Sequence, residues 1–268
     1  MDSKKILLSF DVEEFDTPLE FGKNLALKDQ LEYSYHGLLA VLSLLEKEQV
    51  CATFFTTANF ALHFPELIKK ISETHEIASH GYYHSSFKNE DLEISRKVLK
   101  KITGKEIYGY RMARMMPVDN QTIIDAGYLY NASLHPTYIP GRYNNFHKPR
   151  QPFMTGTLLQ IPASVTPNIR FPVFWLSFKN FPLSIIKLAT KQIIHKDNFV
   201  NFYFHPWEFT NIKDKEKLNL PFYISRLSGE KMIKKLENFI SWSKMKGYTF
   251  KNYWEQASFL IEDKNTSS

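Results

Sequence analysis

The sequence predicts an α/β fold in which parallel strands are joined by crossover helices. Eight short runs rich in β-branched and aromatic residues alternate with longer segments whose apolar residues recur at helical spacing. This alternation favours parallel strands. The number of units favours a barrel over an open sheet, although the pattern alone does not decide between them. A chain of 268 residues is long enough for one such barrel, so we expect residues 1–268 to form a single domain.

The predicted strands are runs of three to six residues, short enough for strands and enriched in residues that fit a half-buried sheet. They cover residues 5–10, 51–55, 75–79, 107–110, 128–133, 158–163, 199–204 and 248–250.

Helices are predicted between these strands from apolar spacing and from residues that begin or end helices. Pro65 favours a first helical turn, Asn89 and Asp119 are candidate N-caps, and Gly104 and Gly247 are typical of helix ends. We expect residues 136–157, rich in Pro, Gly and Asn, to form a long loop at the active face, and residues 211–268 to include C-terminal helices packed on the barrel. The predicted helices cover residues 34–48, 65–73, 89–102, 119–127, 182–195, 228–246 and 252–262.

Composition and charge exclude several classes of function. The net charge of +6 comes mostly from scattered lysines, a pattern that argues against nucleic-acid binding. The single cysteine, Cys51, excludes an intramolecular disulfide and a cysteine-based metal cluster. The N-terminus shows no signal peptide, and no apolar run is long enough to cross a bilayer. We therefore expect a cytoplasmic protein.

Ionisable residues follow five of the predicted strands. In a parallel barrel the carboxyl ends of the strands converge on one face, where active sites lie. We therefore expect these side chains to form one cluster, although a polar residue at the end of any single strand is ordinary. They are Asp11, Glu13 and Glu14, then His80 and His84, then Arg111, then His135, and finally His205 and Glu208.

The run SHGYYH and the run SFDVEE together suggest a metal site. His80 and His84 are four residues apart, a spacing that can bring two imidazoles to one ion, although two unrelated surface histidines would look the same. Two histidines and one carboxylate form a common open zinc site. Asp11 and Glu13 share a side if the strand continues, so that one could ligate the metal while the other takes a proton from the attacking water. Arg111 would compensate the charge of the carboxylates.

The run FYFHPWEF ends an apolar strand with a histidine. His205 is either a proton donor or a structural loop residue. Trp207 is either part of the core or a platform on which a sugar stacks. Glu208 either orients His205 or pairs with a lysine. We expect Tyr110, His135, Trp207 and Glu208 to contact the substrate.

In this order, the motifs SFDVEE (9–14), SHGYYH (79–84), GYR (109–111) and FHPWE (204–208) resemble polysaccharide deacetylases of the NodB-homology type, carbohydrate esterase family 4. The resemblance runs from about residue 5 to residue 210. HEIASHGYYH and FHPWEF look especially like the bacterial branch linked to exopolysaccharide and cell-envelope sugar synthesis.

The resemblance implies a distorted (β/α) barrel of about seven parallel strands, one divalent metal ion, usually zinc, and hydrolysis of an N-acetyl group from an amino sugar. By the same resemblance Asp11 is the catalytic base, which Arg111 orients, and His205 is the general acid. His80 and His84 match the metal histidines of the family.

Two departures from the family pattern bear on this assignment. Many members have two adjacent aspartates after the first strand, and the second of these is Val12 here. We carry the third metal ligand to Glu13, with Glu14 as the alternative. The arginine motif has Ala113 and a later Pro117 where the family usually has an early proline, so we expect a different substrate groove.

The sequence therefore predicts a metal-dependent hydrolase that removes an N-acetyl or other N-acyl group from an amino sugar. The alternatives are a metal-free or cyclic-amide C–N hydrolase on the same fold, a catalytically inactive sugar-binding module, and a protein with a structural or interaction role. The apolar, lysine-bearing segment 171–192 is expected to form a core helix, with cover for the barrel mouth, contact with a second subunit or peripheral contact with a membrane as alternatives.

Overall fold

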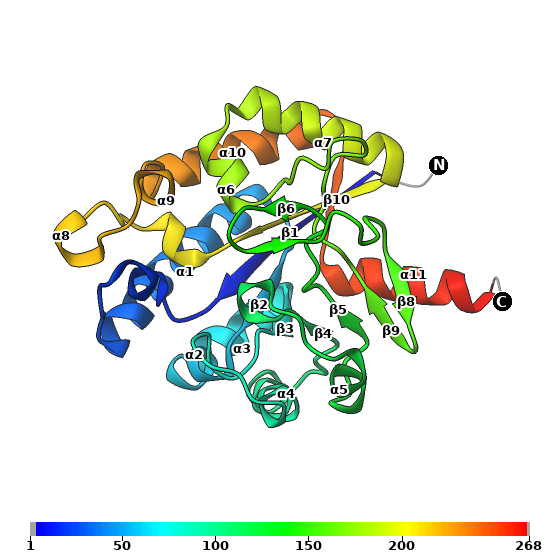
Figure 1. The fold of residues 1–268 in the computed structure, drawn as a ribbon, viewed down its shortest axis with the longest axis horizontal. Coiled ribbons are helices and arrows are strands. Elements are labelled where there is room, and N and C mark those ends of the chain that lie inside the picture. The colour runs from blue at the N-terminus through cyan, green and yellow to red at the C-terminus, as the bar shows by residue number, and fades with distance from the viewer. Residues whose placement is uncertain (1–3, 267–268) are drawn as a thin grey trace.

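A curled, mostly parallel sheet forms the centre of the protein, shown by a computed structural model that describes residues 4–266 (Figure 1). Seven strands run parallel in the order β10–β1–β2–β3–β4–β5–β9. This arrangement confirms the predicted α/β fold and distorted barrel. The seven strands are β1 (Lys5–Val12), β2 (Thr53–Thr56), β3 (Glu76–Ser79), β4 (Gly109–Tyr110), β5 (Tyr130–Asn131), β9 (Leu158–Gln160) and β10 (Phe199–Phe204).

Two further strands join the sheet away from this path. β11 (Thr249–Lys251) pairs in parallel with the first half of β1, and β8 (Phe153–Thr155) pairs antiparallel to β9 at the edge. Between β9 and β10 the barrel is joined by side chains. The amide of Ser164 donates to Asn201 Oδ1 at 2.8 Å, and the amide of Asn201 donates to Ser164 Oγ at 2.9 Å.

Most helices cover the outer face of the sheet (Figure 1), whereas Tyr253 and Ala257 of α11 pack with the cluster inside the barrel. Every predicted helix is present, but α1 begins at Leu27, earlier than the predicted start at residue 34, and α2, α6, α8 and α9 lie outside the predicted helix ranges. The α-helices are α1 (Leu27–Glu48), α2 (Ala58–His63), α3 (Pro65–Thr74), α4 (Glu90–Thr103), α5 (Asn120–Asp125), α6 (Trp175–Asn180), α7 (Leu183–Asp197), α8 (Lys215–Leu218), α9 (Phe222–Ser225), α10 (Glu230–Met245) and α11 (Tyr253–Thr266).

The predicted helix ends are mostly confirmed. Pro65 begins α3, Gly104 ends α4 in the left-handed conformation, and Asp119 accepts the amide of Thr122 at 3.0 Å. Asn89 precedes α4 but makes no capping hydrogen bond through its side chain. That prediction was wrong because Asn89 has helical backbone angles, whereas a capping residue usually has extended ones.

The segment predicted as a loop, residues 136–157, contains strands. β6 (Tyr138–Ile139) and β7 (Tyr143–Asn144) form an antiparallel hairpin, and β8 lies in the same segment. Gly141 at the hairpin turn has φ +76°, which a glycine adopts without strain. Two-residue strands are too short to give a periodic pattern, which explains why the sequence reads as a loop here.

The two faces of β1 meet different surroundings. Phe10 and Val12 lie in the apolar core between the sheet and the outer helices, whereas Leu7 packs inside the barrel with Phe55 and Tyr130. Because successive side chains alternate between faces, Asp11 has the inward direction of Leu7. This alternation brings carboxylates to the mouth of the barrel.

The approach of α1 to the 3₁₀ helix η3 (Pro206–Phe209) depends on one glycine. A Cβ atom on Gly37 would lie 1.8 Å from the carbonyl oxygen of Pro206. Only glycine fits at this crossing, and the contact holds the segment that follows His205 against α1. Within the described residues, no helix is both long and apolar enough to cross a membrane.

Candidate metal centre and active site

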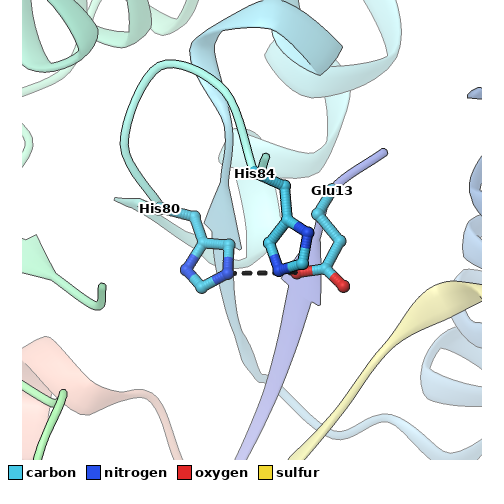
Figure 2. A group of neighbouring side chains, drawn as sticks. All are labelled: Glu13, His80 and His84. Carbon is cyan, nitrogen blue, oxygen red and sulfur yellow. Dashed lines mark hydrogen bonds and ion pairs between the residues drawn. The ribbon is translucent and has the colours of Figure 1, made fainter. Parts of the chain in front are cut away.

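Glu13, His80 and His84 form a compact cluster at the mouth of the barrel (Figure 2). Glu13 Oε2 lies 3.1 Å from the Nε2 atoms of both His80 and His84. All three residues are at least nine-tenths buried. Burial raises the pKa of Glu13, but His84, His205 and His80 outweigh it and hold that pKa below its usual range.

The second ring nitrogen of each histidine is engaged elsewhere. His80 Nδ1–H donates to the carbonyl oxygen of Arg111 at 2.8 Å, and His84 Nδ1–H donates to Asp16 Oδ1 at 2.7 Å. These bonds fix the tautomers so that both Nε2 lone pairs face Glu13, an arrangement common around metal ions. Two imidazole nitrogens and one carboxylate oxygen are a donor set that suits a divalent ion such as zinc.

Glu14, the alternative carboxylate, points away from this cluster. Its carboxylate accepts hydrogen bonds from Thr57 Oγ1 at 3.1 Å and from Asn59 Nδ2. Thr57 is also the N-cap of α2. Glu14 therefore ties β1 to α2, and the geometry leaves Glu13 as the carboxylate that faces both histidines.

Asp11 and Arg111 form a buried ion pair beside the cluster. Arg111 Nη1 donates to Asp11 Oδ1 at 2.5 Å and to Ser9 Oγ at 3.0 Å. Arg111 Nη2 donates to Tyr253 OH at 3.0 Å, and the guanidinium lies 3.9 Å from the centre of the Phe55 ring. These contacts hold the arginine rigidly, so that Asp11 has a fixed orientation in the pocket.

His205 lies on the other side of the pocket and is held by Glu208. Its backbone amide and its Nδ1–H both donate to Glu208 Oε1, at 2.9 and 3.1 Å. Glu208 Oε2 lies 3.1 Å from Lys179 Nζ, and both of these side chains are fully buried. Burial lowers the pKa of His205, but Glu13 and Glu208 outweigh it and the net direction is upward.

Trp207 connects this side of the pocket to the metal cluster. Its indole Nε1–H donates to Glu13 Oε1 at 3.2 Å, and its ring stacks on His205 with centroids 4.9 Å apart. Trp207 also stacks on Phe15 and is almost fully buried. It lines the pocket, and substrate contact by this ring stays a prediction.

One pocket contains the predicted catalytic and metal-binding groups except the buried Arg111. Its walls include the β6–β7 hairpin, the start of α6 and Tyr223 of α9. The lining residues that carry chemistry are Asp11, Glu13, Glu20, His80, His84, Arg114, Arg142 and His205.

The structure does not bring Tyr110, His135 and Glu208 to the pocket wall. Tyr110 is buried in the outer core with its hydroxyl on Met112 Sδ, which argues against the predicted substrate contact. His135 donates or accepts a hydrogen bond with Tyr143 OH at 2.8 Å, and burial, aided by Arg111, lowers its pKa to about 3. Glu208 both supports His205 and pairs with Lys179, so it has both of the roles considered for it.

Asp16 and Arg114 were not among the predicted site residues. Asp16 orients His84, and Arg114 Nη2 donates to Asp16 Oδ2 at 2.9 Å while its Nε donates to Glu20 Oε1 at 3.1 Å. Arg114 has φ +55°, a left-handed conformation that is uncommon for arginine. The sequence signal that could have found Asp16 is its place as the fourth carboxylate in the acidic run DVEEFD, residues 11–16.

Comparison with known proteins agrees with this geometry. Residues 37–116 match the family model for polysaccharide deacetylase, a span that contains His80, His84 and Arg111. Over this span the chain is similar to polysaccharide deacetylases. Asp11, Glu13 and His205 lie outside the matched span, so their placement beside the family's histidines comes from the fold.

A curated relative and two solved structures are similar to this chain. Peptidoglycan-N-acetylmuramic acid deacetylase PdaA of Bacillus subtilis (strain 168) is 35% identical over 74 residues, which are 25% of this chain and 28% of that protein. A putative polysaccharide deacetylase from Mycobacterium smegmatis has a TM-score of 0.66 at 18% identity, covering 98% of this chain and 92% of the other. PuuE allantoinase has a TM-score of 0.65 at 17% identity, covering 96% and 90%. The two structures show the fold.

Proposed function

We propose that this chain is a metal-dependent hydrolase that removes an N-acetyl or other N-acyl group from an amino sugar during envelope or exopolysaccharide synthesis. One observation carries the proposal: a two-histidine, one-glutamate cluster, an Asp–Arg pair and a carboxylate-held histidine meet at one pocket. The name of the relative PdaA, a deacetylase of N-acetylmuramic acid in peptidoglycan, supports an acetylated amino sugar as substrate.

Glu13, His80 and His84 are the residues that would hold the ion, and we propose zinc because it accepts imidazole and carboxylate ligands together. When bound, such an ion supplies Lewis acidity toward the acyl oxygen and toward the attacking water. The buried Trp207 indole, which donates to Glu13 Oε1 at 3.2 Å, leaves Glu13 Oε2 to face the histidines.

Asp11 would act as the general base. Its carboxylate lines the pocket next to the cluster, and the bond from Arg111 to Oδ1 leaves Oδ2 as the oxygen able to accept a proton from water. Arg111 also balances the buried negative charge of the Asp11 carboxylate. A proton transfer by a positioned carboxylate contributes about 10²–10⁴-fold to such a reaction.

His205 would protonate the departing amine. Glu208 accepts from Nδ1, so that Nε2 is the ring atom directed away from Glu208 and able to transfer a proton. The upward direction of its pKa favours the protonated form that an acid requires. Lys179 compensates the buried charge of Glu208, which therefore acts as a positioning residue.

The decisive experiment combines metal analysis with a screen of N-acetylated amino sugars for acetate release, before and after chelation. The proposal expects acetate release that requires metal. Release without metal indicates a metal-free hydrolase. Opening of a cyclic amide without acetate release indicates the cyclic-amide alternative, and sugar binding without turnover indicates an inactive module.

Exchange of both His80 and His84 for Ala should abolish metal uptake. The matched control exchanges two exposed histidines, His147 and His195, for Ala. Full metal content in the first double variant would contradict the assigned site. The cytoplasmic location remains a prediction.

A further inference from the structure

The net positive charge of the protein comes from one segment that lacks acidic residues. Residues 126–196 contain three arginines and five lysines but no aspartate or glutamate. The rest of the chain therefore has 26 basic residues against 28 acidic ones. This acid-free segment supplies the β6–β7 hairpin and α6, which form one wall of the pocket.

Helix α7 of this segment exposes apolar side chains opposite its buried face. Ile186 and Ile193 pack in the core, whereas Phe181, Ile185 and Leu188 are 42%, 42% and 58% exposed. Ile185 and Leu188 are three residues apart and share one side of α7, and Phe181 lies in the extended backbone just before the helix. Lys191 follows Leu188 by three residues and is exposed on the same side.

Helix α9 extends this apolar surface to the pocket mouth. Asn180, next to Phe181, donates through Nδ2 to the carbonyl oxygen of Tyr223 at 2.9 Å. Phe222 is 74% exposed with the Arg226 guanidinium over its ring, and Tyr223 lines the pocket. We define the α7–α9 surface by Phe181, Ile185, Leu188, Lys191, Phe222 and Arg226.

We propose that the α7–α9 surface rests on an anionic phospholipid bilayer and brings the pocket mouth to the membrane. Exposed apolar side chains interleaved with cations are the signature of an interfacial membrane contact. Among the described residues, neither Lys191 nor Arg226 forms an ion pair, so both charges are available to lipid phosphates. In a symmetric dimer through this surface, Lys191 and Arg226 of the two copies would approach one another, with repulsion in place of attraction.

The test is cosedimentation of the purified chain with vesicles of phosphatidylglycerol and phosphatidylcholine, compared with vesicles of phosphatidylcholine alone. We expect binding to the anionic vesicles at low ionic strength and its loss in high salt. Exchange of Lys191 and Arg226 for Gln should weaken the partition coefficient by about 30-fold, since each basic residue near such a surface contributes about 1 kcal/mol. The matched control exchanges Lys69 and Lys70 of α3 for Gln, which should leave binding unchanged.

A second pair of variants tests the apolar part. Exchange of Ile185 and Leu188 for Ser should also reduce vesicle binding, whereas exchange of Leu62 and Ile94, which are 50% and 44% exposed on α2 and α4, should not. Three results would overturn the proposal. The first is no sedimentation with anionic vesicles, and the second is an equal loss of binding in the control variants. The third is that the protein binds a soluble polyanion such as heparin as well as it binds the vesicles, and that the Ser exchanges do not reduce this binding. A dimer in light scattering that the Ser exchanges convert to monomer, without vesicle binding, would assign the surface to a second copy. None of these readouts depends on enzymatic activity, so they stand apart from the proposed hydrolase function.

Discussion

Asp16 should control metal affinity without touching the metal. Its Oδ1 accepts from His84 Nδ1 at 2.7 Å, and the residue is 2% exposed. Removal of this carboxylate frees the His84 ring to rotate and makes its Nε2 a weaker donor to a cation. We therefore expect Asp16→Asn and Asp16→Ala to bind metal more weakly than the unaltered protein.

The magnitude follows from the kind of hydrogen bond. A bond to a charged acceptor contributes about 1.5–3 kcal/mol and a neutral one about 0.5–1.5 kcal/mol. Asn keeps a neutral acceptor, so Asp16→Asn should lose about 1–1.5 kcal/mol, or roughly five- to tenfold in affinity. Asp16→Ala loses the whole bond and should fall by about 10–100-fold.

The assay is competition for the metal against a chelator of known affinity. Burial lowers the pKa of His84, but Glu13 and Asp16 outweigh it, so the net shift is upward. Because a proton on His84 competes with the metal, the assay should be run above neutral pH. Glu20→Gln is the matched control, since Glu20 also bonds Arg114 but has no contact with His84. Equal affinity in Asp16→Ala and Glu20→Gln would refute the reasoning.

Three further predictions concern the base, the acid and the core. Asp11→Asn should keep its metal content and lose about 10²–10⁴-fold in acetate release; retained turnover would assign the base elsewhere. Glu208→Gln should lower the pKa of His205, because the Glu208 carboxylate raises it against burial, and the alkaline limb of kcat/KM should move to lower pH; an unmoved limb would contradict the acid role. Gly37→Ala should cost about 1–3 kcal/mol in urea unfolding through its clash with Pro206, and unchanged stability would mean that α1 can shift freely.

The alternation of side chains on β1 was readable from the sequence, and it predicted that Asp11 and Glu13 share a side if the strand continues. Val12 is buried in the outer core, so the position where the family often has a second aspartate faces away from the pocket here. Glu13 follows β1 on the inward side and takes the position facing both histidines. This part of the site depends only on strand period and on where the strand ends.

The roles of Glu14 and Asp16 could not be read in the same way. Both lie in an irregular turn after β1, where no period constrains direction, and their partners Thr57 and His84 are more than 40 residues away. Lys179 was hidden for a related reason. It reads as an ordinary helical lysine beside Phe178, and only the approach of Glu208 in space explains its burial.

Trp207 contacts both the candidate metal ligand Glu13 and the proposed general acid His205, and so couples their positions. The same indole donates to Glu13 and stacks on His205. Phe15 also stacks on this indole ring. These contacts join the segment after β1 to the segment after β10, strands that are neighbours in the sheet along Lys5–Phe10. Because Gly37 lets α1 press on η3, the distance between base and acid is set by core packing rather than by the pocket residues alone. A substitution in α1 that displaced η3 would therefore lower turnover while leaving Glu13, His80 and His84 chemically intact.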